Sequence, residues 1–308
     1  MASETNVRDL IAKNNAKKGG FSDKIVPIIL GLIAAISILT TIGILFTLIT
    51  ETITFFTRVS IVEFLFTKDW NPTGSDPKYG IWALVIGTLK ITVIATIVAV
   101  PIGLGAAIYL SEYASDKARR IIKPILEILA GIPTIVFGFF ALTFVTPVLR
   151  TIIPALDSFN SVSPGIVVGI MIVPVITSMS EDAMASVPNK IREGAYGLGS
   201  TKFEVATKVV LPAAASGVVA SIVLGISRAI GETMIVSLAA GSSPTASLNL
   251  TNSIQTMTGY IVEVATGDAT FGSDMYYSIY AVGFTLFIFT LIMNLISYWI
   301  SKRFREEY

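Results

Sequence analysis

The chain of 308 residues contains neither cysteine nor histidine, which excludes disulfides, thiolate or imidazole metal ligands, and catalysis by either residue. Charged residues are also scarce, at 14% of the chain, about half the share found in soluble domains. The formal net charge of +1 argues against a nucleic-acid-binding protein. Apolar residues, in contrast, make up 53% of the chain, and the mean hydropathy is +0.75. These values indicate a polytopic membrane protein.

Six segments are long and apolar enough to cross the roughly 30 Å of membrane hydrocarbon as helices. The second is interrupted by Lys90, and the fifth contains Arg228 and Glu232. The predicted spans are Ile25–Thr50, Tyr79–Ser111, Ile128–Leu149, Ser158–Ser180, Ala213–Ala240 and Met275–Ser301. A helix satisfies its own backbone hydrogen bonds in lipid, and strand alternation is absent. We therefore expect an all-α membrane protein with six transmembrane helices.

The distribution of basic residues predicts the orientation of these spans. Sixteen Lys and Arg residues lie in the N-terminal tail, the 112–124 loop, the 181–212 loop and the C-terminal end, against four in the opposite loops. Both termini are therefore expected in the cytoplasm, with the protein in the plasma (inner) membrane. The predicted divisions are a cytoplasmic tail over 1–24, a six-helix domain over 25–301 and a cytoplasmic tail over 302–308.

The cytoplasmic loop 181–212 is too long for a simple connection between two helices. It contains start and stop signals for two short helices, the first expected over about 189–198. The signals are Ser186 as a cap, Pro188 in the first turn, Gly199 as the stop, Thr201 and Glu204 as a capping box, and Pro212 before the fifth span. We expect two helices joined at a glycine, lying at the membrane face.

The same loop resembles the conserved loop of permeases in ABC importers, which reads Glu-Ala-Ala, three residues, Gly, nine residues, then Ile-x-Leu-Pro. The spacing matches throughout, with Gly194 in place of Ala and Val209 in place of Ile. The resemblance implies a type I ABC importer permease fold, in which 189–199 is a coupling helix that seats in a groove of the ATPase. The residues assigned to this coupling are Arg192, Glu193, Gly194, Ala195, Gly199, Leu211 and Pro212.

A superficial match to a phosphate-binding loop lies in the same segment, from Gly194 to Lys202. Its order is wrong, because the lysine must follow the second glycine directly and precede Ser or Thr, and no strand comes before it. We therefore expect a transport subunit and not an enzyme. ATP and Mg²⁺ are expected on a partner ATPase, with no cofactor in this chain.

Arg228 and Glu232 are four residues apart and share one helix face in the fifth span. An ionised residue at the bilayer centre costs about 2.5–3.5 kcal/mol on insertion scales, so such residues usually face an aqueous path or a partner. The planar guanidinium suits phosphate-like oxyanions. A structural ion pair is the alternative, although Arg before Glu is the weaker order for a local pair.

The string Gly225–Met234 resembles the Gly-x-Gly-Arg-Ala-x-Gly-Glu-Thr-Met signature of phosphate-importer permeases, with Ser227 replacing the second glycine. The resemblance covers about residues 60 to 300, and its long first outer loop is similar to the PstC type and not to the sibling PstA type. Further matching segments are Trp70, Pro72, Tyr79-Gly80, Gly87-Thr88, Ala99–Gly103, Tyr109–Tyr113 and Glu127–Gly138.

This resemblance implies an importer of inorganic phosphate. Its other parts would be a sibling permease (PstA type), an ATPase dimer (PstB type) and an external phosphate-binding protein (PstS type), all assembled in membrane lipid. The implied substrate pathway contains Arg228 as an anion contact, Glu232 as a tuning group and Thr233 as a hydroxyl donor.

The two remaining charge assignments carry alternatives. Lys90 departs from the family pattern: it adds positive potential near the anion path or pairs with Glu232, or it is a snorkelling lysine in the outer half. Glu232 orients Arg228, or weakens anion affinity to permit release, or accepts a hydrogen bond from protonated phosphate.

Two other features have structural interpretations. Glu127 is expected at the cytoplasmic start of the third span, where a helix N-terminus favours a carboxylate. The pair Gly165 and Gly169 forms a close-packing face, used either within the chain or against another subunit.

Two rival functions remain. A permease for sulfate or molybdate would keep the coupling loop and should lose the Arg-Ala-Ile-Gly-Glu-Thr string. A secondary transporter would lack the coupling loop and is expected to show an inverted repeat, and the sequence shows none. A membrane enzyme is less favoured still, because no nucleophile–base pair or metal-ligand cluster is visible.

Overall fold

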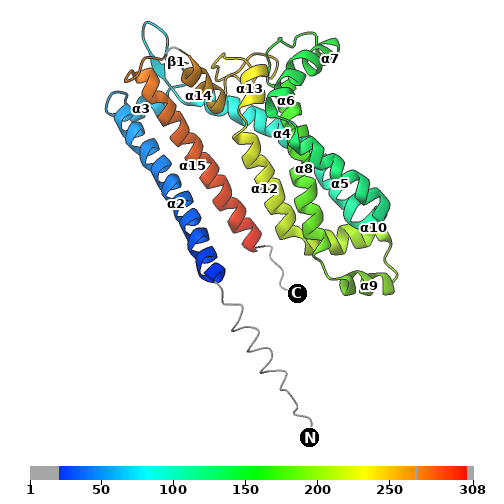
Figure 1. The fold of residues 1–308 in the computed structure, drawn as a ribbon. Coiled ribbons are helices and arrows are strands. Elements are labelled where there is room, and N and C mark those ends of the chain that lie inside the picture. The colour runs from blue at the N-terminus through cyan, green and yellow to red at the C-terminus, as the bar shows by residue number, and fades with distance from the viewer. Residues whose placement is uncertain (1–20, 268, 304–308) are drawn as a thin grey trace. The chain divides into compact units, whose positions relative to one another are not determined.

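The computed structural model describes residues 21–267 and 269–303, and nearly all of its regular structure is helical (Figure 1). The chain divides into two compact units, 1–51 and 52–308. Helix α2, Phe21–Phe56, begins in the first unit and ends in the second. Its segment Ile25–Phe56 has a mean hydropathy of 2.6, and apolar residues surround the helix axis, as in a membrane span.

The second unit contains the remaining helices and one short hairpin. In the hairpin, Trp70 is paired with Tyr79 in antiparallel register. The elements are α3 Ile61–Phe66, β1 Trp70–Asn71, β2 Lys78–Tyr79, α4 Trp82–Ile108, the π-helix η1 Tyr109–Tyr113, α5 Asp116–Gly131, α6 Thr134–Phe140, the π-helix η2 Ala141–Val145, α7 Thr146–Ile152, α8 Val162–Ala185, α9 Asn189–Gly197, α10 Lys202–Glu204, the π-helix η3 Val205–Val210, α11 Leu211–Ala213, α12 Ala215–Ile230, α13 Met234–Ala239, α14 Met257–Thr266 and α15 Asp274–Arg303.

In the described part of the chain, five helices are long and apolar enough to cross a membrane. The number becomes six if Lys202–Ala213 and Ala215–Ile230, which meet at an angle of 75°, count as one bent span. The predicted all-α class is thus confirmed, and the predicted six spans are reached when the bent pair is counted as one. The predicted limits of the fifth span, 213–240, are wrong, because α12 ends at Ile230 and α13 is a separate helix.

The third span also differs from its prediction. Its helical segment is Thr134–Ile152, because the chain is extended at Ile132 and Pro133. Glu127 lies four residues before the C-terminal end of α5, and not at the start of a span, so the predicted N-terminal location is wrong. The preceding helix α5 is capped by Ser115, whose hydroxyl accepts a hydrogen bond from the amide of Ala118.

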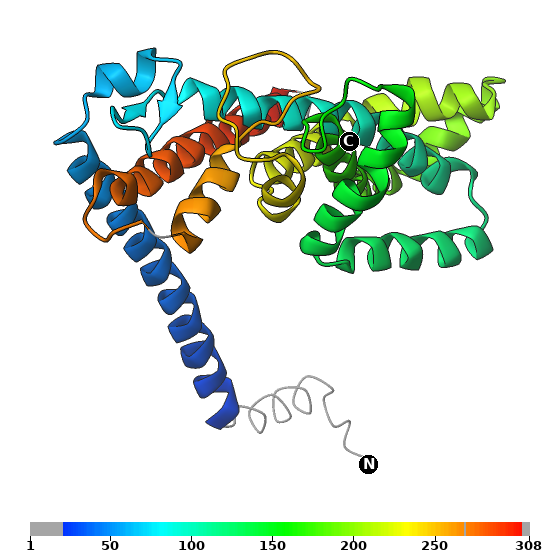
Figure 2. The same ribbon diagram turned by 90° about the horizontal axis from the view of Figure 1, so that it is seen from above.

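Helices α4, α8 and α12 pack together and contain most of the central apolar core (Figures 1 and 2). Glycines permit the close approach of α8 to α4. A Cβ added at Gly165 would lie 2.7 Å from Ile94, and one at Gly169 would lie 2.8 Å from Val98. The Gly165 and Gly169 face is therefore used for packing within this chain.

A second core lies around the hairpin and is mainly aromatic. Trp70 packs edge-on against Tyr79 and Tyr260, with ring centroids 5.7 and 4.8 Å apart. Phe55 and Phe64 extend the same cluster. Burial raises the pKa of Tyr79 to about 12, with Asp274 and Glu63 adding to the effect, and burial likewise raises the pKa of Tyr260. Both phenols therefore stay neutral and serve packing.

Gly87 permits a third close approach, between α4 and the segment before α14. A Cβ at this position would overlap the carbonyl oxygen of Gln255, which is backbone and cannot rotate away. We expect Gly87→Ala to destabilise the protein by about 1–3 kcal/mol, the usual cost of overpacking. Gly105→Ala on the same helix meets nothing within 4 Å and is the matched control. Thermal unfolding in detergent measures the difference, and equal melting temperatures for the two variants would contradict the packing.

Candidate functional site

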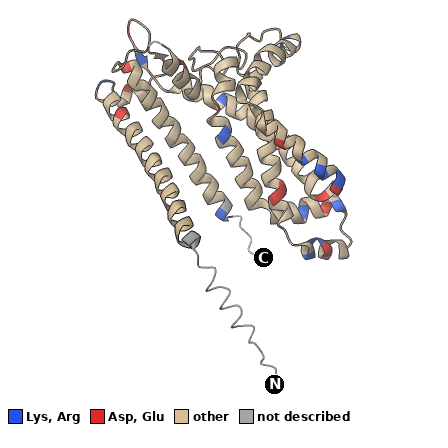
Figure 3. Ribbon diagram, in the orientation of Figure 1, with Lys and Arg blue, Asp and Glu red and all other residues tan. Residues whose placement is uncertain are grey.

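Charged residues gather in two regions of the second unit, with mainly apolar helix between them (Figure 3). One region contains α5, α9 and α10, and the other contains α3 and the hairpin. Two features therefore stand out as candidates for function. The first is the break between α12 and α13, which includes charged residues within an apolar segment. The second is the loop around α9.

The break between α12 and α13 is stabilised by Glu232. Its carboxylate oxygen accepts hydrogen bonds from the amides of Met234 (3.1 Å) and Ile235 (3.2 Å), so it caps the first turn of α13. The residue is 8% exposed. A carboxylate at a helix start satisfies amide groups that have no partner within the helix. Glu232 therefore has a structural use that the sequence did not indicate.

Two threonines complete the break. The Thr258 hydroxyl donates a hydrogen bond to the carbonyl oxygen of Glu232 (2.7 Å), which ties the break to α14. The Thr233 hydroxyl donates to the Gly231 carbonyl oxygen (3.1 Å). At the first residue of α14, the amide of Met257 donates a hydrogen bond to the Thr88 hydroxyl (3.0 Å). These contacts connect α4, α14 and the break.

Arg228 lies near the end of α12, and its side chain is exposed. Across residues 21–267 and 269–303 it makes no hydrogen bond or ion pair, and Glu232 in particular is not its partner. The structural ion pair between these two residues is thus not formed. Arg228 keeps all its donors available for a ligand or a partner chain.

Lys90 is buried on α4, at 7% exposure, and its ammonium donates to the carbonyl oxygen of Asn249 (2.6 Å). No ion pair joins it to Glu232 in the described ranges. The Asn249 segment is also held by Ser161, whose hydroxyl donates to the Leu250 carbonyl oxygen (2.7 Å). Lys90 therefore fastens the loop between α13 and α14 to α4, a use that no residue pattern signalled.

The 181–212 loop has the two predicted helices. Helix α9 begins at Asn189, after the extended residue Pro188, and Gly199 adopts a left-handed φ of 86° that favours glycine. The capping box is formed: the Thr201 hydroxyl accepts from the Glu204 amide (3.3 Å), and the Thr201 amide donates to the Glu204 carboxylate (3.0 Å). The predicted Ser186 cap is wrong, because that hydroxyl donates back to Ala183.

The predicted coupling residues do not all face the same way. Glu193, Gly194, Gly199 and Pro212 are exposed, and Ala195 and Leu211 are half-buried against the core under the loop. The side chain of Arg192 is only 14% exposed and turns inward. Three exposed apolar side chains, which the sequence analysis missed, lie in the same loop: Tyr196 at 42%, Leu198 at 90% and Phe203 at 67%.

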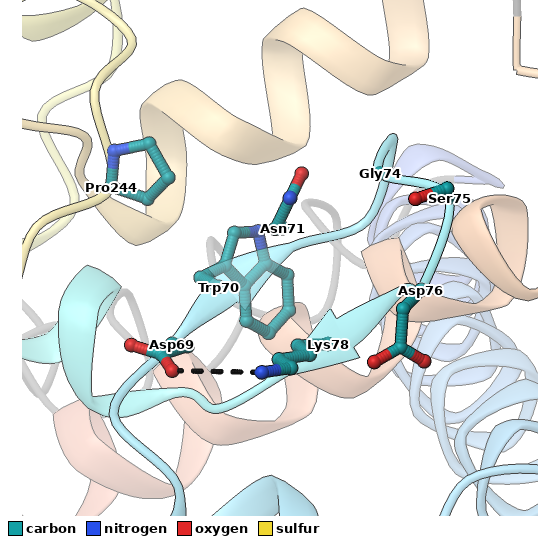
Figure 4. A pocket seen from close by; sticks show the side chains of 8 residues that line it. All are labelled: Asp69, Trp70, Asn71, Gly74, Ser75, Asp76, Lys78 and Pro244. Atoms are coloured by element: carbon teal, nitrogen blue, oxygen red, sulfur yellow. Dashed lines mark ion pairs between the residues drawn. The ribbon is translucent and has the colours of Figure 1, made fainter.

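The β1–β2 hairpin borders a polar cavity of about 670 Å³ (Figure 4). Its one ion pair among the residues drawn joins Lys78 to Asp69 at 3.9 Å. The lining residues are Asp69, Trp70, Asn71, Gly74, Ser75, Asp76, Lys78 and Pro244. In the part of the chain that the structure describes, no group of three acidic side chains converges as a metal site would require.

Comparisons with known proteins place this architecture. Residues 99–306 match the family described as binding-protein-dependent transport system inner membrane component. A bacterial alginate ABC transporter in complex with its alginate-bound periplasmic protein has a similar fold, with a TM-score of 0.63 at 17% identity over 92% of this chain and 97% of that one. An inward-facing MetNI methionine ABC transporter has a TM-score of 0.54 at 18% identity over 74% and 95% of the two chains.

Two relatives are closer in sequence. A probable ABC transporter permease, YqgH of Bacillus subtilis, is 34% identical over 80% of this chain and 79% of that protein. The phosphate transport system permease PstC of Xylella fastidiosa (strain 9a5c) is 34% identical over 77% of each. The fold and these matches define a multi-pass membrane permease subunit of an ABC transporter, which is a transport component and not an enzyme. The chain belongs to the binding-protein-dependent transport inner membrane component family, and its resemblance to the PstC type is confirmed.

The cap at Glu232 generates a prediction. Glu232→Ala should lower stability by about 0.5–2 kcal/mol, since two amides of α13 lose their acceptor. Glu232→Gln should lose little, because its amide oxygen can still accept. Glu193→Ala, at an exposed position, is the control and should leave the melting temperature unchanged. Thermal unfolding of the purified protein compares them, and an unchanged melting temperature for Glu232→Ala would rule out the cap.

Proposed function

We propose that this chain is the PstC-type permease subunit of an ATP-driven importer of inorganic phosphate. The observation that carries the proposal is Arg228, an exposed arginine without a partner in the described chain, inside the string that resembles the phosphate-permease signature. The name of the Xylella relative, a phosphate transport system permease, supports the same solute. A sulfate or molybdate permease is the alternative, because the same guanidinium chemistry would bind those anions.

In this proposal, Arg228 contacts the anion during passage. A guanidinium presents parallel N–H donors that match the oxygens of a phosphate, and it stays charged at any physiological pH. The exposed end of α12 makes these donors accessible. Thr233, in the break that follows, is the proposed hydroxyl donor. Passage also requires weak binding, because an anion that is held tightly at one site does not leave it.

Glu232 and Lys90 act on the pathway indirectly in this proposal. The Glu232 carboxylate is engaged by the amides of α13, so its negative charge is partly offset by the helix start and repels an anion less. Lys90 lends positive potential while it holds the loop between α13 and α14. Both residues would thus shape the break beside Arg228, and neither needs to touch phosphate.

Coupling to ATP hydrolysis is proposed to occur through the loop around α9. Tyr196, Leu198 and Phe203 present apolar surface, next to the exposed Glu193 and Gly194. Exposed apolar side chains of this size mark protein contacts when they cluster. The partner would be an ATPase dimer of the PstB type, which supplies ATP and Mg²⁺. The basic residues on this side favour a cytoplasmic location for the loop and both termini.

The remaining partners are proposed on the basis of the family. A binding protein is part of the transport systems to which this family belongs, and one solved relative is in complex with its periplasmic protein. We propose a phosphate-binding protein of the PstS type at the outer loops and a sibling permease of the PstA type beside this chain. The polar cavity at the hairpin lies on the proposed outer side.

The pathway assignment is tested by phosphate uptake into proteoliposomes containing the whole importer. Arg228→Gln should abolish or strongly reduce uptake, while hydrolysis stimulated by the binding protein continues, because the coupling loop is unchanged. Arg150→Gln is the control, an exposed arginine bonded only to Ser158 among described residues, and it should transport normally. Normal uptake by Arg228→Gln would refute the assignment, and competition by sulfate or molybdate at equal concentration would refute the solute.

The coupling surface is tested by co-purification of the ATPase. Leu198→Glu should weaken ATPase association at least tenfold, because a desolvated charge replaces an apolar contact near the proposed interface centre. Leu248→Glu changes a leucine of similar exposure, at 82%, in the loop between α13 and α14, and should leave association intact. If both variants retain the ATPase at wild-type stoichiometry, the docking surface lies elsewhere.

A further inference from the structure

Arg192 is held inside the protein, although it belongs to the coupling helix. Its Nε and Nη2 donate to the same oxygen of Glu112, at 3.2 and 3.0 Å. Nη2 also donates to the Met184 carbonyl oxygen at 2.7 Å, and Nη1 donates to that of Val187. The neighbouring Glu193 is exposed. The Arg192 guanidinium is thus bound to groups inside this chain, whereas the adjacent Glu193 is exposed.

Glu112 lies in η1, the continuation of α4, and its side chain is 5% exposed. Its oxygen also accepts a hydrogen bond from the Ser111 hydroxyl (3.0 Å). A buried carboxylate and guanidinium depend on each other, because removing one leaves the other charged and desolvated. The pair therefore joins α9 to the end of α4 by a directional contact that neither partner can easily release.

A second ion cluster braces the same end of α4. Glu181 on α8, at 2% side-chain exposure, pairs with Lys123 at 2.5 Å and with Arg119 at 3.6 Å, both from α5. Arg119 also donates to the carbonyl oxygen of Leu110 at 2.6 Å, two residues before Glu112. Helices α5 and α8 are therefore fixed to the turn that receives Arg192, which makes that turn a firm attachment point.

The chain itself connects α9 only to α8 and α10, through the extended Pro188 and the left-handed Gly199. No backbone link joins α9 to α4. The apolar core under the loop brings Ala107 of α4 near Met184 and Val205, but such packing has little directional preference. The Arg192–Glu112 pair fixes the orientation of α9 relative to α4, because a guanidinium binds a carboxylate at a restricted angle.

Helix α4 also reaches the candidate pathway. Near its other end, the Thr88 hydroxyl accepts a hydrogen bond from the amide of Met257, the first residue of α14, and the Thr258 hydroxyl of α14 donates to the carbonyl oxygen of Glu232. Thr88 and Glu112 are separated by about 36 Å of helix at 1.5 Å per residue. Helix α4 with its η1 extension therefore contacts the coupling loop directly and is linked to the break beside Arg228 through α14.

We propose that the Arg192–Glu112 ion pair transmits movement of the coupling helix to α4. Arg192 and Glu112 are then positioning residues for transport. Arg192 is not an ATPase contact in this proposal. This inference rests on the proposed function, because it assumes that α9 docks on an ATPase. It gives Arg192 a different role from the exposed residues of the same helix.

The test uses the complete importer in proteoliposomes and measures phosphate imported per ATP hydrolysed. Arg192→Gln and Glu112→Gln should each lower this ratio roughly tenfold, within the range of coupling energies for residues in contact. The ATPase should still co-purify, and hydrolysis should still respond to the binding protein. The exchange of both charges, Glu112→Arg with Arg192→Glu, should restore the ratio at least in part, which a merely structural loss at either site would not allow.

Arg120→Gln and Glu127→Gln are the matched controls, since both residues are exposed on α5. They should leave the ratio unchanged. If the glutamine variants fold poorly, Arg192→Lys keeps the charge without the forked grip and should give an intermediate ratio in folded protein.

Three results would contradict the proposed role of the Arg192–Glu112 pair. They are an unchanged ratio in both glutamine variants, loss of the ATPase from Arg192→Gln, and no recovery in the exchanged pair. The proposed function fails in a different way, when the wild-type importer hydrolyses ATP and moves no phosphate.

Discussion

Charged and hydrogen-bonding groups in an apolar environment must find partners within the protein, and this constraint governs the second unit. Glu232 satisfies this constraint by accepting hydrogen bonds from two amides at the start of α13. Lys90 satisfies it by donating a hydrogen bond to the Asn249 carbonyl oxygen. Both solutions use backbone groups and not side chains of opposite charge. The helix is thus interrupted at Glu232 and a distant loop is fixed to α4, whereas the donors of Arg228 have no partner among residues 21–267 and 269–303.

Helix α4 is the common frame of the described structure. Glycines on α8 and Gly87 on α4 permit close backbone approaches on two sides of this helix. At one end Thr88 accepts a hydrogen bond from the first residue of α14, and at the other the η1 extension receives an ion pair from α9 and hydrogen bonds from Arg119 of α5. A helix packed so closely at several levels moves as a rigid body more readily than it bends, which suits a protein whose proposed partners act at opposite membrane faces.

Much of this structure could be predicted from residue patterns, for identifiable reasons. The spans follow from apolar length, and the helices of the coupling loop follow from Gly199 and the Thr201 capping box. The break after Ile230 could not be predicted in the same way. Hydropathy does not reveal that the Glu232 carboxylate caps the helix that follows it. The partner of Lys90 is a backbone carbonyl 159 residues away, which no residue type reveals. Likewise, the motif identified Arg192 but not the direction of its side chain.

The 75° bend at Ala214 has a geometric consequence for the loop. Residues 202–213 form a continuous helical arm of roughly 18 Å that lies crosswise to α12. When α12 rotates, such an arm swings about its junction with α12, and its far end moves the most. A rotation of about 10° at the bend would displace its tip by roughly 3 Å, about two residues of helix rise. The joint therefore converts small angular changes at α12 into linear travel at Gly199, and the same conversion operates in reverse.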